Sequence, residues 1–411
     1  MSPPSPGTAP PAAPAPPAAP AAPAANPGAR LWLLAMITLT GTLAMHIFVP
    51  ALPLVAQGLE TSVGLAQMTL SAYIVGLALA QLVYGPVSDQ FGRKPVLIVG
   101  TLLYTLGSLV AMEAPTIDFL IAARFFEAVG GGAGMVLGRA IVRDITSGPD
   151  AARKLSLMNL MVILGPGLSP MIGAAIAAAS GWRAIFLALA ALGLVNLLLI
   201  WRRLPETRAG RGHDSRTVLR SYARLLRSRR FLGYAVGGGC ATTAMYAYIG
   251  AAPFIFVHQL DRPMQEVGLY LALNILGVWF GSLAVSRLAG KVTMTRLLVA
   301  GNLLSCAGAF AFLLFVLAGP LHILTVVLPM LLVAFGAGIS SPMAVTQALN
   351  VNPAVSGSAS GLYGFAQMGI GGLCAALSGL GSNPALTAAA VLAVGGVLAQ
   401  LLFWMARSSA P

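Results

Sequence analysis

Gly85-Pro86-Val87-Ser88-Asp89-Gln90-Phe91-Gly92-Arg93-Lys94 is a short polar segment between two long apolar stretches. Each flanking stretch is close to the ~20 residues that a helix needs to cross a bilayer. Gly85 and Gly92 permit close approach of the backbone in a tight turn. Asp89 is suited to cap a helix start or to pair with an arginine. The segment therefore predicts a turn between two membrane helices.

The composition of the whole chain supports this interpretation. Of its 411 residues, 57% are hydrophobic and only 9% are charged, and the mean hydropathy is +0.85. A soluble domain needs roughly 25% charged residues to cover its surface. The composition excludes a soluble enzyme and predicts an exterior that faces lipid.

Outward from the segment, apolar stretches of similar length follow one another along the chain. We expect an all-α membrane protein with twelve transmembrane helices in two six-helix bundles. The expected spans are 31–55, 65–84, 95–112, 117–141, 155–179, 182–201, 231–257, 267–288, 295–317, 321–344, 357–380 and 386–404.

The basic residues predict the orientation. With the amino end in the cytoplasm, 21 of the 24 Lys and Arg residues fall on the cytoplasmic side, the exceptions being Arg124, Arg183 and Arg262. Such an excess is typical of cytoplasmic loops. Both termini are therefore expected in the cytoplasm, and the net charge of +13 does not indicate nucleic-acid binding.

The chain divides into four parts. Residues 1–29 contain eleven Pro and eleven Ala and are expected to be a disordered cytoplasmic tail. Residues 30–204 and 231–411 are expected to form the two bundles. The linker 205–230 belongs to a loop, Arg202 to Arg230, that holds ten arginines. Two such bundles joined by a basic loop predict a transporter with its substrate path between them.

The opening segment resembles the signature G-x-x-x-D-x-x-G-R-[RK] of the major facilitator superfamily. Residues 31–406 as a whole resemble the Bcr/CflA-type drug:proton antiporters, through this segment and the stretches Phe48–Pro53, Arg139–Asp144, Pro166–Gly173, Gly181–Phe186 and Pro205–Thr207. The resemblance implies proton-driven export of small, varied molecules such as amphenicols across the inner membrane. It also implies a cytoplasmic gate formed by Gly85, Asp89, Gly92, Arg93, Lys94, Arg139, Arg143 and Asp144.

In such a gate, Asp89 is expected near the start of span eleven, around Gly357 and Ser358, and near an arginine at the end of span four. An anion is stabilised beside the amino end of a helix. These contacts are expected to hold the outward-facing state. A tight turn without a gating role is the alternative.

Two departures from the family concern proton coupling. His46 stands where the family commonly has an acid, and Glu127 stands where a Gln or similar residue is common. Charges at membrane depth are functional candidates, and Arg124 and Glu127 share a helical face at i, i+3. We expect Glu127 to carry the proton, Arg124 to modulate it and His46 to face it from span one; a structural ion pair and a neutral, hydrogen-bonded histidine are the alternatives.

Span five contains helix-bending residues that resemble the superfamily's antiporter motif, namely Gly165, Pro166, Pro170 and Gly173. Each proline removes a backbone donor and bends the helix, as an ordinary membrane kink would also do. On span four, Gly130, Gly134 and Gly138 form a small-residue stripe that permits close packing, with span five as a candidate neighbour.

Candidate cavity residues in the second half are Tyr246, Tyr248, Asn274, Tyr363 and Gln367, each of which could equally serve packing. The expected partners are a small molecule, protons and the bilayer, with the proton gradient as energy source, no cofactor or metal, and a monomeric state. An intramembrane enzyme is disfavoured because no nucleophile–base pair or metal-ligand spacing occurs. An exporter of an endogenous metabolite or sugar on the same fold is the alternative function.

Overall fold

The computed structural model describes residues 27–145, 165–207, 215–288, 290–352 and 355–408. These residues are almost entirely helical and contain no β-strand. The greater part of the Pro/Ala-rich tail and the first ten residues of the expected span five lie outside them.

The first bundle is built from six membrane crossings. Helix α1 (Pro27–Phe48) continues through a 3-10 turn, η1 (Val49–Ala51), into α2 (Leu52–Gly58). The remaining crossings are α3 (Val63–Phe91), α4 (Arg93–Met112), α5 (Ile117–Ile145), a helical stretch over 165–180, and α7 (Trp182–Arg203). α1 begins four residues before the expected span, with a proline in the first helical position, where its missing N–H has no cost.

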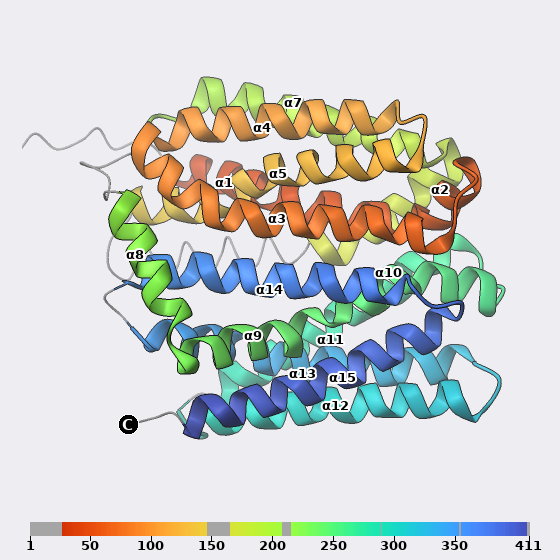
Figure 1. Cartoon of the computed structure of the whole chain (residues 1–411). Coiled ribbons are helices and arrows are strands. Elements are labelled where there is room, and N and C mark those ends of the chain that lie inside the picture. The colour runs from red at the N-terminus through yellow and green to blue at the C-terminus, as the bar shows by residue number, and fades with distance from the viewer. Residues whose placement is uncertain (1–26, 146–164, 208–214, 289, 353–354, 409–411) are drawn as a thin grey trace, which may run out of the picture.

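The second bundle follows a short linker helix, α8 (Ser215–Leu226). Its first crossing consists of α9 (Arg229–Thr243), α10 (Met245–Phe254) and a π-helical turn, η2 (Ile255–Gln259). The others are α11 (Met264–Leu288), α12 (Met294–Ala318), α13 (Ile323–Asn350), α14 (Ser356–Ser378) and α15 (Pro384–Ser408). Figure 1 shows the two bundles side by side, with α8 across one end.

Ten of the described helical segments are long and apolar enough to cross a membrane. Together with α14 and the stretch 165–180 they make the twelve helices expected from the sequence. Large apolar side chains point outward, among them Leu194 on α7, Leu314 on α12 and Trp404 on α15, each more than 60% exposed. Arg124, Glu127 and Asn302 are buried instead. This distribution is that of a multi-pass membrane protein.

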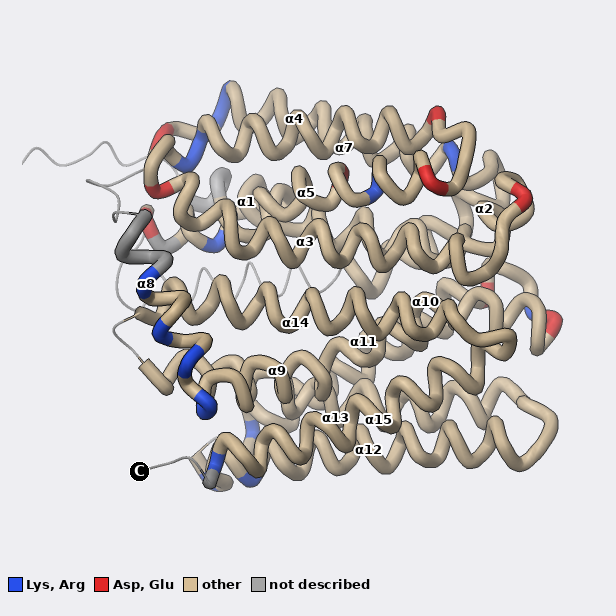
Figure 2. The backbone as a smooth tube through the Cα atoms, viewed as in Figure 1, with Lys and Arg blue, Asp and Glu red and all other residues tan. Residues whose placement is uncertain are grey.

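The charges lie mostly at the two ends of the bundles (Figure 2). We call the end that carries Arg93, α8 and Arg296 the basic end, and the end that carries Glu60 and Glu266 the opposite end. Several helices continue past their apolar spans at the basic end: α3 reaches Phe91, and α13 reaches Asn350.

The bundles meet along two seams. α3 lies beside α14 (Figure 1), and the Ser378 hydroxyl donates to the Gln67 side-chain oxygen near the opposite end, at 3.2 Å. On the other side, the backbone of Pro170 and Met171 approaches Gly268 of α11 so closely that a side chain at Gly268 would collide with it.

The small-residue stripe on α5 packs inside the first bundle. A side chain at Gly134 would collide with the carbonyl of Ile37, and one at Gly138 with the Thr38 side chain, both on α1. Gly130 lies against Tyr104 of α4 in the same way. Within the described residues, the neighbours of the stripe in these contacts are therefore α1 and α4.

Candidate functional site

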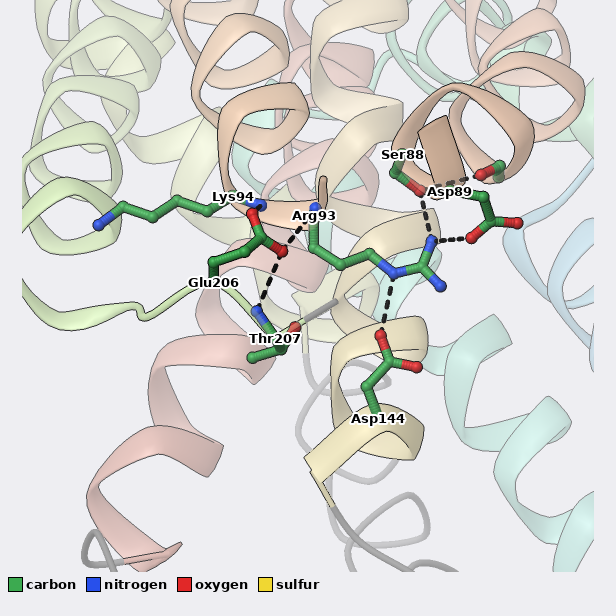
Figure 3. A network of polar contacts seen from close by, with 8 residues as sticks. Ser88, Asp89, Arg93, Lys94, Asp144, Glu206 and Thr207 are labelled. Carbon is green, nitrogen blue, oxygen red and sulfur yellow. Dashed lines mark hydrogen bonds and ion pairs between the residues drawn. The ribbon is translucent and has the colours of Figure 1, made fainter. Parts of the chain in front are cut away.

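A network of polar side chains joins the ends of three helices at the basic end (Figure 3). Arg93 lies at its centre, with Nη1 2.6 Å from Asp89 Oδ1 and Nε 2.9 Å from Asp144 Oδ2. Arg93 Nη1 also donates to the Ser88 hydroxyl at 2.5 Å. One guanidinium thus holds the end of α3, the start of α4 and the end of α5 together, and the three side chains of the two ion pairs are only partly exposed.

The start of α4 has a second anchor, which the sequence analysis did not identify. The Glu206 carboxylate, just after α7, accepts hydrogen bonds from the backbone N–H groups of Arg93 (2.9 Å) and Lys94 (3.1 Å). Lys94 Nζ in turn donates to the Trp201 carbonyl at 3.0 Å. The first N–H groups of a helix have no partner within it, so a carboxylate there is stabilising. The sequence feature that could have indicated this anchor is the Pro205-Glu206-Thr207 stretch, which contains Glu206.

The turn between α3 and α4 is shorter than expected. Gly92 alone connects the two helices, with a φ of 98° that favours glycine. Gly85 was expected to share the turn, but it lies within α3, where nothing crowds it. α3 continues to Phe91 with Pro86 inside it. The Ser88 hydroxyl donates back to the Gly85 carbonyl at 2.9 Å within this last part of α3.

A cavity of about 640 Å³ lies between the bundles at the basic end. Asp89, Arg139 and Asp144 line it from the first bundle, and Gly357 and Ser358 line it from the start of α14. The expected neighbours therefore share one cavity. The ion pair of Asp89, however, is with Arg93, and among the described residues no ion pair or hydrogen bond joins the Asp89 side chain to α14 in this arrangement. The side chain of Arg143 lies outside the described part of the structure.

Halfway along the first bundle, Arg124 and Glu127 form an ion pair that is completely buried. Arg124 Nη1 lies 2.7 Å from Glu127 Oε2, and the Ser108 hydroxyl donates to Glu127 Oε1 at 3.0 Å. Arg124 Nη2 donates to the Ala44 carbonyl on α1 at 3.2 Å. The predicted pairing is confirmed, and the pair is connected to α4 and α1 as well as to its own helix.

Aromatic rings enclose the guanidinium. Its central carbon is 4.0 Å from the centre of the Tyr73 ring, 4.9 Å from that of Phe48 and 5.6 Å from that of Phe186. Such cation–π contacts stabilise a cation removed from water. The Tyr73 hydroxyl donates to the Gly41 carbonyl at 2.9 Å, which holds the ring in place.

His46 lies in different surroundings from Glu127. Its Nδ1 is 2.8 Å from the carbonyl oxygen of Thr42, so Nδ1 carries the proton, because a carbonyl can only accept. Its ring is 6.3 Å from that of Tyr246 in the second bundle. The described contacts of Glu127 are with Arg124 and Ser108. His46 therefore lies at the contact between the bundles, whereas Glu127 faces α4.

His46 lines a small pocket of about 10 Å³ between the bundles, no larger than one water molecule. This pocket brings together residues from three of the sequence predictions: His46, the helix-bending Pro166 and Pro170, and Asn274. The side-chain oxygen of Asn274 is buried, and by hydrogen-bond distance and angle it has no partner among the described residues. The remaining lining is apolar: Val49, Met245, Ile249, Leu271 and Ile275. Gly165 and Gly173 lie on the same helical stretch, outside the lining of this pocket.

The other candidates of the second bundle are packed within it. The Tyr248 ring lies 6.3 Å from Phe312, edge to face. Gln367 Nε2 donates to the Thr242 hydroxyl at 2.9 Å and joins α14 to α9. The Tyr363 side chain is buried close to Gly238 of α9. Tyr363 and Gln367 do share a face, but that face contacts a neighbouring helix.

Comparison with known proteins agrees with this architecture. Residues 34–376 match the family model of the Major Facilitator Superfamily. The chain is 31% identical to YdgK, an uncharacterized MFS-type transporter of Bacillus subtilis (strain 168), over 92% of this chain and 94% of that one. It is 30% identical to multidrug resistance protein D of Escherichia coli (strain K12), over 85% and 88%. A chloramphenicol resistance protein of Pseudomonas aeruginosa is 27% identical, over 82% and 80%.

Solved structures share the fold at lower identity. A D-xylose-proton symporter superposes with a TM-score of 0.73 at 16% identity, over 92% of this chain and 97% of that one. A bacterial homolog of the human lysosomal transporter Spinster, in an inward-facing and occupied conformation, gives 0.74 at 15%, over 93% and 97%. The family match and the named relatives identify this chain as a member of the major facilitator superfamily of membrane transporters, in its Bcr/CflA-type drug-export branch.

Proposed function

We propose that this protein exports small, partly apolar drugs, amphenicol-like or similar antibiotics, in exchange for protons and by alternating access. The observation that supports the proposal is the contact between the bundles around this water-sized pocket, where the lining side chains are apolar except for His46 and Asn274 and where a substrate would fit only after the bundles move apart. Relatives are named for resistance to bicyclomycin, to chloramphenicol and to multiple drugs. A sugar would need many fixed hydrogen-bonding groups, whereas the described side chains at this contact are apolar apart from His46 and Asn274, which favours a partly apolar substrate.

Glu127 is the proposed proton carrier. As a carboxylate it is held by Arg124 and Ser108, and Arg124 also contacts Ala44 on α1 and the Tyr73 ring on α3. Protonation would weaken the ion pair, and the change would reach α1 and α3. These two helices contribute to the contacts between the bundles, α1 through His46 and α3 beside α14. A proton would thereby favour one arrangement of the bundles over the other.

The test is drug accumulation in proteoliposomes across an imposed pH difference. Glu127→Gln should bind drug but lose transport against a drug gradient, because Gln can occupy the site without exchanging a proton. Glu113→Gln removes an exposed acid at the opposite end and serves as the matched control, with transport retained. Uphill accumulation by Glu127→Gln would show that the proton is carried elsewhere.

The network around Arg93 is the proposed gate. In the present arrangement the cavity separates Asp89 from the start of α14. Closure of the basic end would bring the Asp89 carboxylate toward the amino end of α14, where a negative charge is stabilised. Arg139 and Arg143 on α5 are the proposed arginine partners of Asp89 in that closed state.

The basic end is proposed to face the cytoplasm of a bacterial cell, with the chain in the inner membrane and both termini inside. Because one chain supplies both bundles and the pocket between them, we also propose that the monomer is the unit that transports substrate. The orientation can be tested by cysteine labelling. Ser286→Cys at the basic end and Ser382→Cys at the opposite end are both exposed positions. In intact spheroplasts, an impermeant maleimide should label Ser382→Cys and spare Ser286→Cys; the reverse pattern would invert the orientation.

A further inference from the structure

The linker helix α8 lies across the basic end, with its axis crossing those of the long helices (Figures 1 and 2). It therefore runs along the plane of the membrane surface. Leu225 is buried and belongs to the same apolar cluster as Phe231 of α9. Tyr222 reaches the other bundle, where its hydroxyl donates to the Leu82 carbonyl of α3 at 3.4 Å. A single short helix thus contacts both bundles.

The contact with α3 depends on a proline in the segment between spans two and three. Pro86 has no N–H, so the carbonyl of Leu82, four residues earlier, has no donor within the helix. Tyr222 supplies one. Tyr222 and its neighbour Ser221 also line the cavity at the basic end, together with Asp89 and Gly357. The position of α8 is thereby coupled to the region through which substrate would enter.

The outer face of α8 is strongly basic. Arg220 and Arg224 lie one turn apart on the same side of α8, Arg227 follows directly after the last helical residue, and all three are exposed. Within the described residues no acid forms an ion pair with any of them. From residue 215 to the end of the sequence the acids are Asp261 and Glu266, both at the opposite end.

We propose that this arginine face, Arg220, Arg224 and Arg227, binds the anionic headgroups of phospholipids, and that the bound lipid holds α8 across the two bundles. A basic helix in the membrane plane attracts anionic lipid. The half-exposed Leu226, on the flank of the helix between the arginines and the buried side, suits contact with the acyl boundary. This apolar residue and the position at the membrane surface favour lipid as the partner. Lipid binding is independent of which drug is exported.

The first experiment measures lipid retention. The full-length protein is purified from a mixture of phosphatidylcholine and phosphatidylglycerol, and the bound lipid is counted by native mass spectrometry. The protein should retain phosphatidylglycerol preferentially. The triple variant Arg220→Gln/Arg224→Gln/Arg227→Gln should lose about a hundredfold in this preference, at roughly fivefold for each arginine.

The matched control removes three other exposed arginines from the second bundle at the same end, Arg287→Gln/Arg296→Gln/Arg407→Gln, and should retain the lipid. Equal loss in both triple variants would show a diffuse charge effect and overturn the assignment to α8. Inorganic phosphate at millimolar concentration should not displace the lipid. Displacement by phosphate would identify an anion site instead of a lipid site.

The second experiment tests whether lipid holds the helix. Amide hydrogen exchange in 215–226 should be slower in nanodiscs that contain phosphatidylglycerol than in phosphatidylcholine alone, for the unmodified protein and for the control variant. The Arg220→Gln/Arg224→Gln/Arg227→Gln variant should exchange at the same rate in both. Equal rates in the two lipids for the unmodified protein would refute the proposal.

Discussion

Two arginine–carboxylate clusters on neighbouring helices of the first bundle differ chiefly in their exposure to water. The Arg93 side chain is 15% exposed and its partners Asp89 and Asp144 are 32% and 22% exposed, whereas Arg124 and Glu127 are both at 0%. The first cluster borders a cavity and can exchange partners at little cost. The second is enclosed by aromatic rings and bonded to α1 and α4.

The difference sets the free energy that each cluster can contribute. Exposed ion pairs stabilise a protein by about 0.2–1 kcal/mol. Breaking a buried pair by removing one partner costs about 3–5 kcal/mol, because a charge is left without compensation. We therefore expect substitutions at Arg124 to act first on folding, and substitutions at Asp89 to act first on transport.

The largest effect is expected from Arg124→Ala. It leaves the Glu127 carboxylate buried with Ser108 as its remaining donor, and should lower the free energy of unfolding by about 3–5 kcal/mol. The double variant Arg124→Met/Glu127→Leu removes both charges and should recover most of that loss without recovering proton-driven transport. Thermal unfolding in detergent, followed by size-exclusion chromatography, measures the stability of both variants, and transport in proteoliposomes measures their activity. Equal stability of Arg124→Ala and the unmodified protein would mean that the pair contributes little to the fold.

The next largest effect is expected from Asp89→Asn, which should impair transport while changing stability little. Asp89→Asn removes one partly exposed ion pair and should change the free energy of unfolding by less than about 1 kcal/mol. Transport should nevertheless collapse, because Asn cannot provide the charge that the closed gate requires. Export in proteoliposomes and the melting temperature should be measured on the same preparation. Normal export by Asp89→Asn would remove the gating role.

A smaller effect is expected at His46, which lies at the contact between the two bundles. His46→Ala should weaken efflux and shift its pH optimum, whereas His46→Asp should keep activity because it restores the acid common in the family. His46→Gln can still donate to the Thr42 carbonyl but cannot titrate near neutral pH. If its pH profile of efflux matches that of the unmodified protein, His46 serves only as a hydrogen-bonding group.

The smallest effect is expected from Glu206→Gln. A neutral amide can accept hydrogen bonds from the Arg93 and Lys94 N–H groups but loses the interaction of the negative charge with the start of α4. The expected loss is about 0.3–1 kcal/mol in the free energy of unfolding, with transport largely retained. A collapse of transport comparable to that of Asp89→Asn would assign Glu206 to the gate itself.

Much of the architecture could be predicted from local features of the sequence. Apolar stretches near 20 residues long predicted the twelve helices, since a membrane helix must satisfy its own backbone and expose an apolar surface whatever its neighbours are. The pairing of Arg124 with Glu127 followed from their spacing on one helix. The turn was predicted in the right place but was too long, because apolar length does not reveal where a helix continues past the bilayer, as α3 does to Phe91.

The sequence by itself thus determined which segments cross the membrane, which residues carry charge at depth, and which family the chain resembles. Only the tertiary structure decided which groups meet: Glu206 with the start of α4, His46 with Asn274 around one pocket instead of with Glu127, and Tyr222 with the carbonyl that Pro86 leaves free. The physical reason is that helix formation depends on neighbours within a few residues, whereas these contacts depend on how rigid helices rotate and pack against one another. Small residues and bends set that packing, and their partners are far away in the sequence.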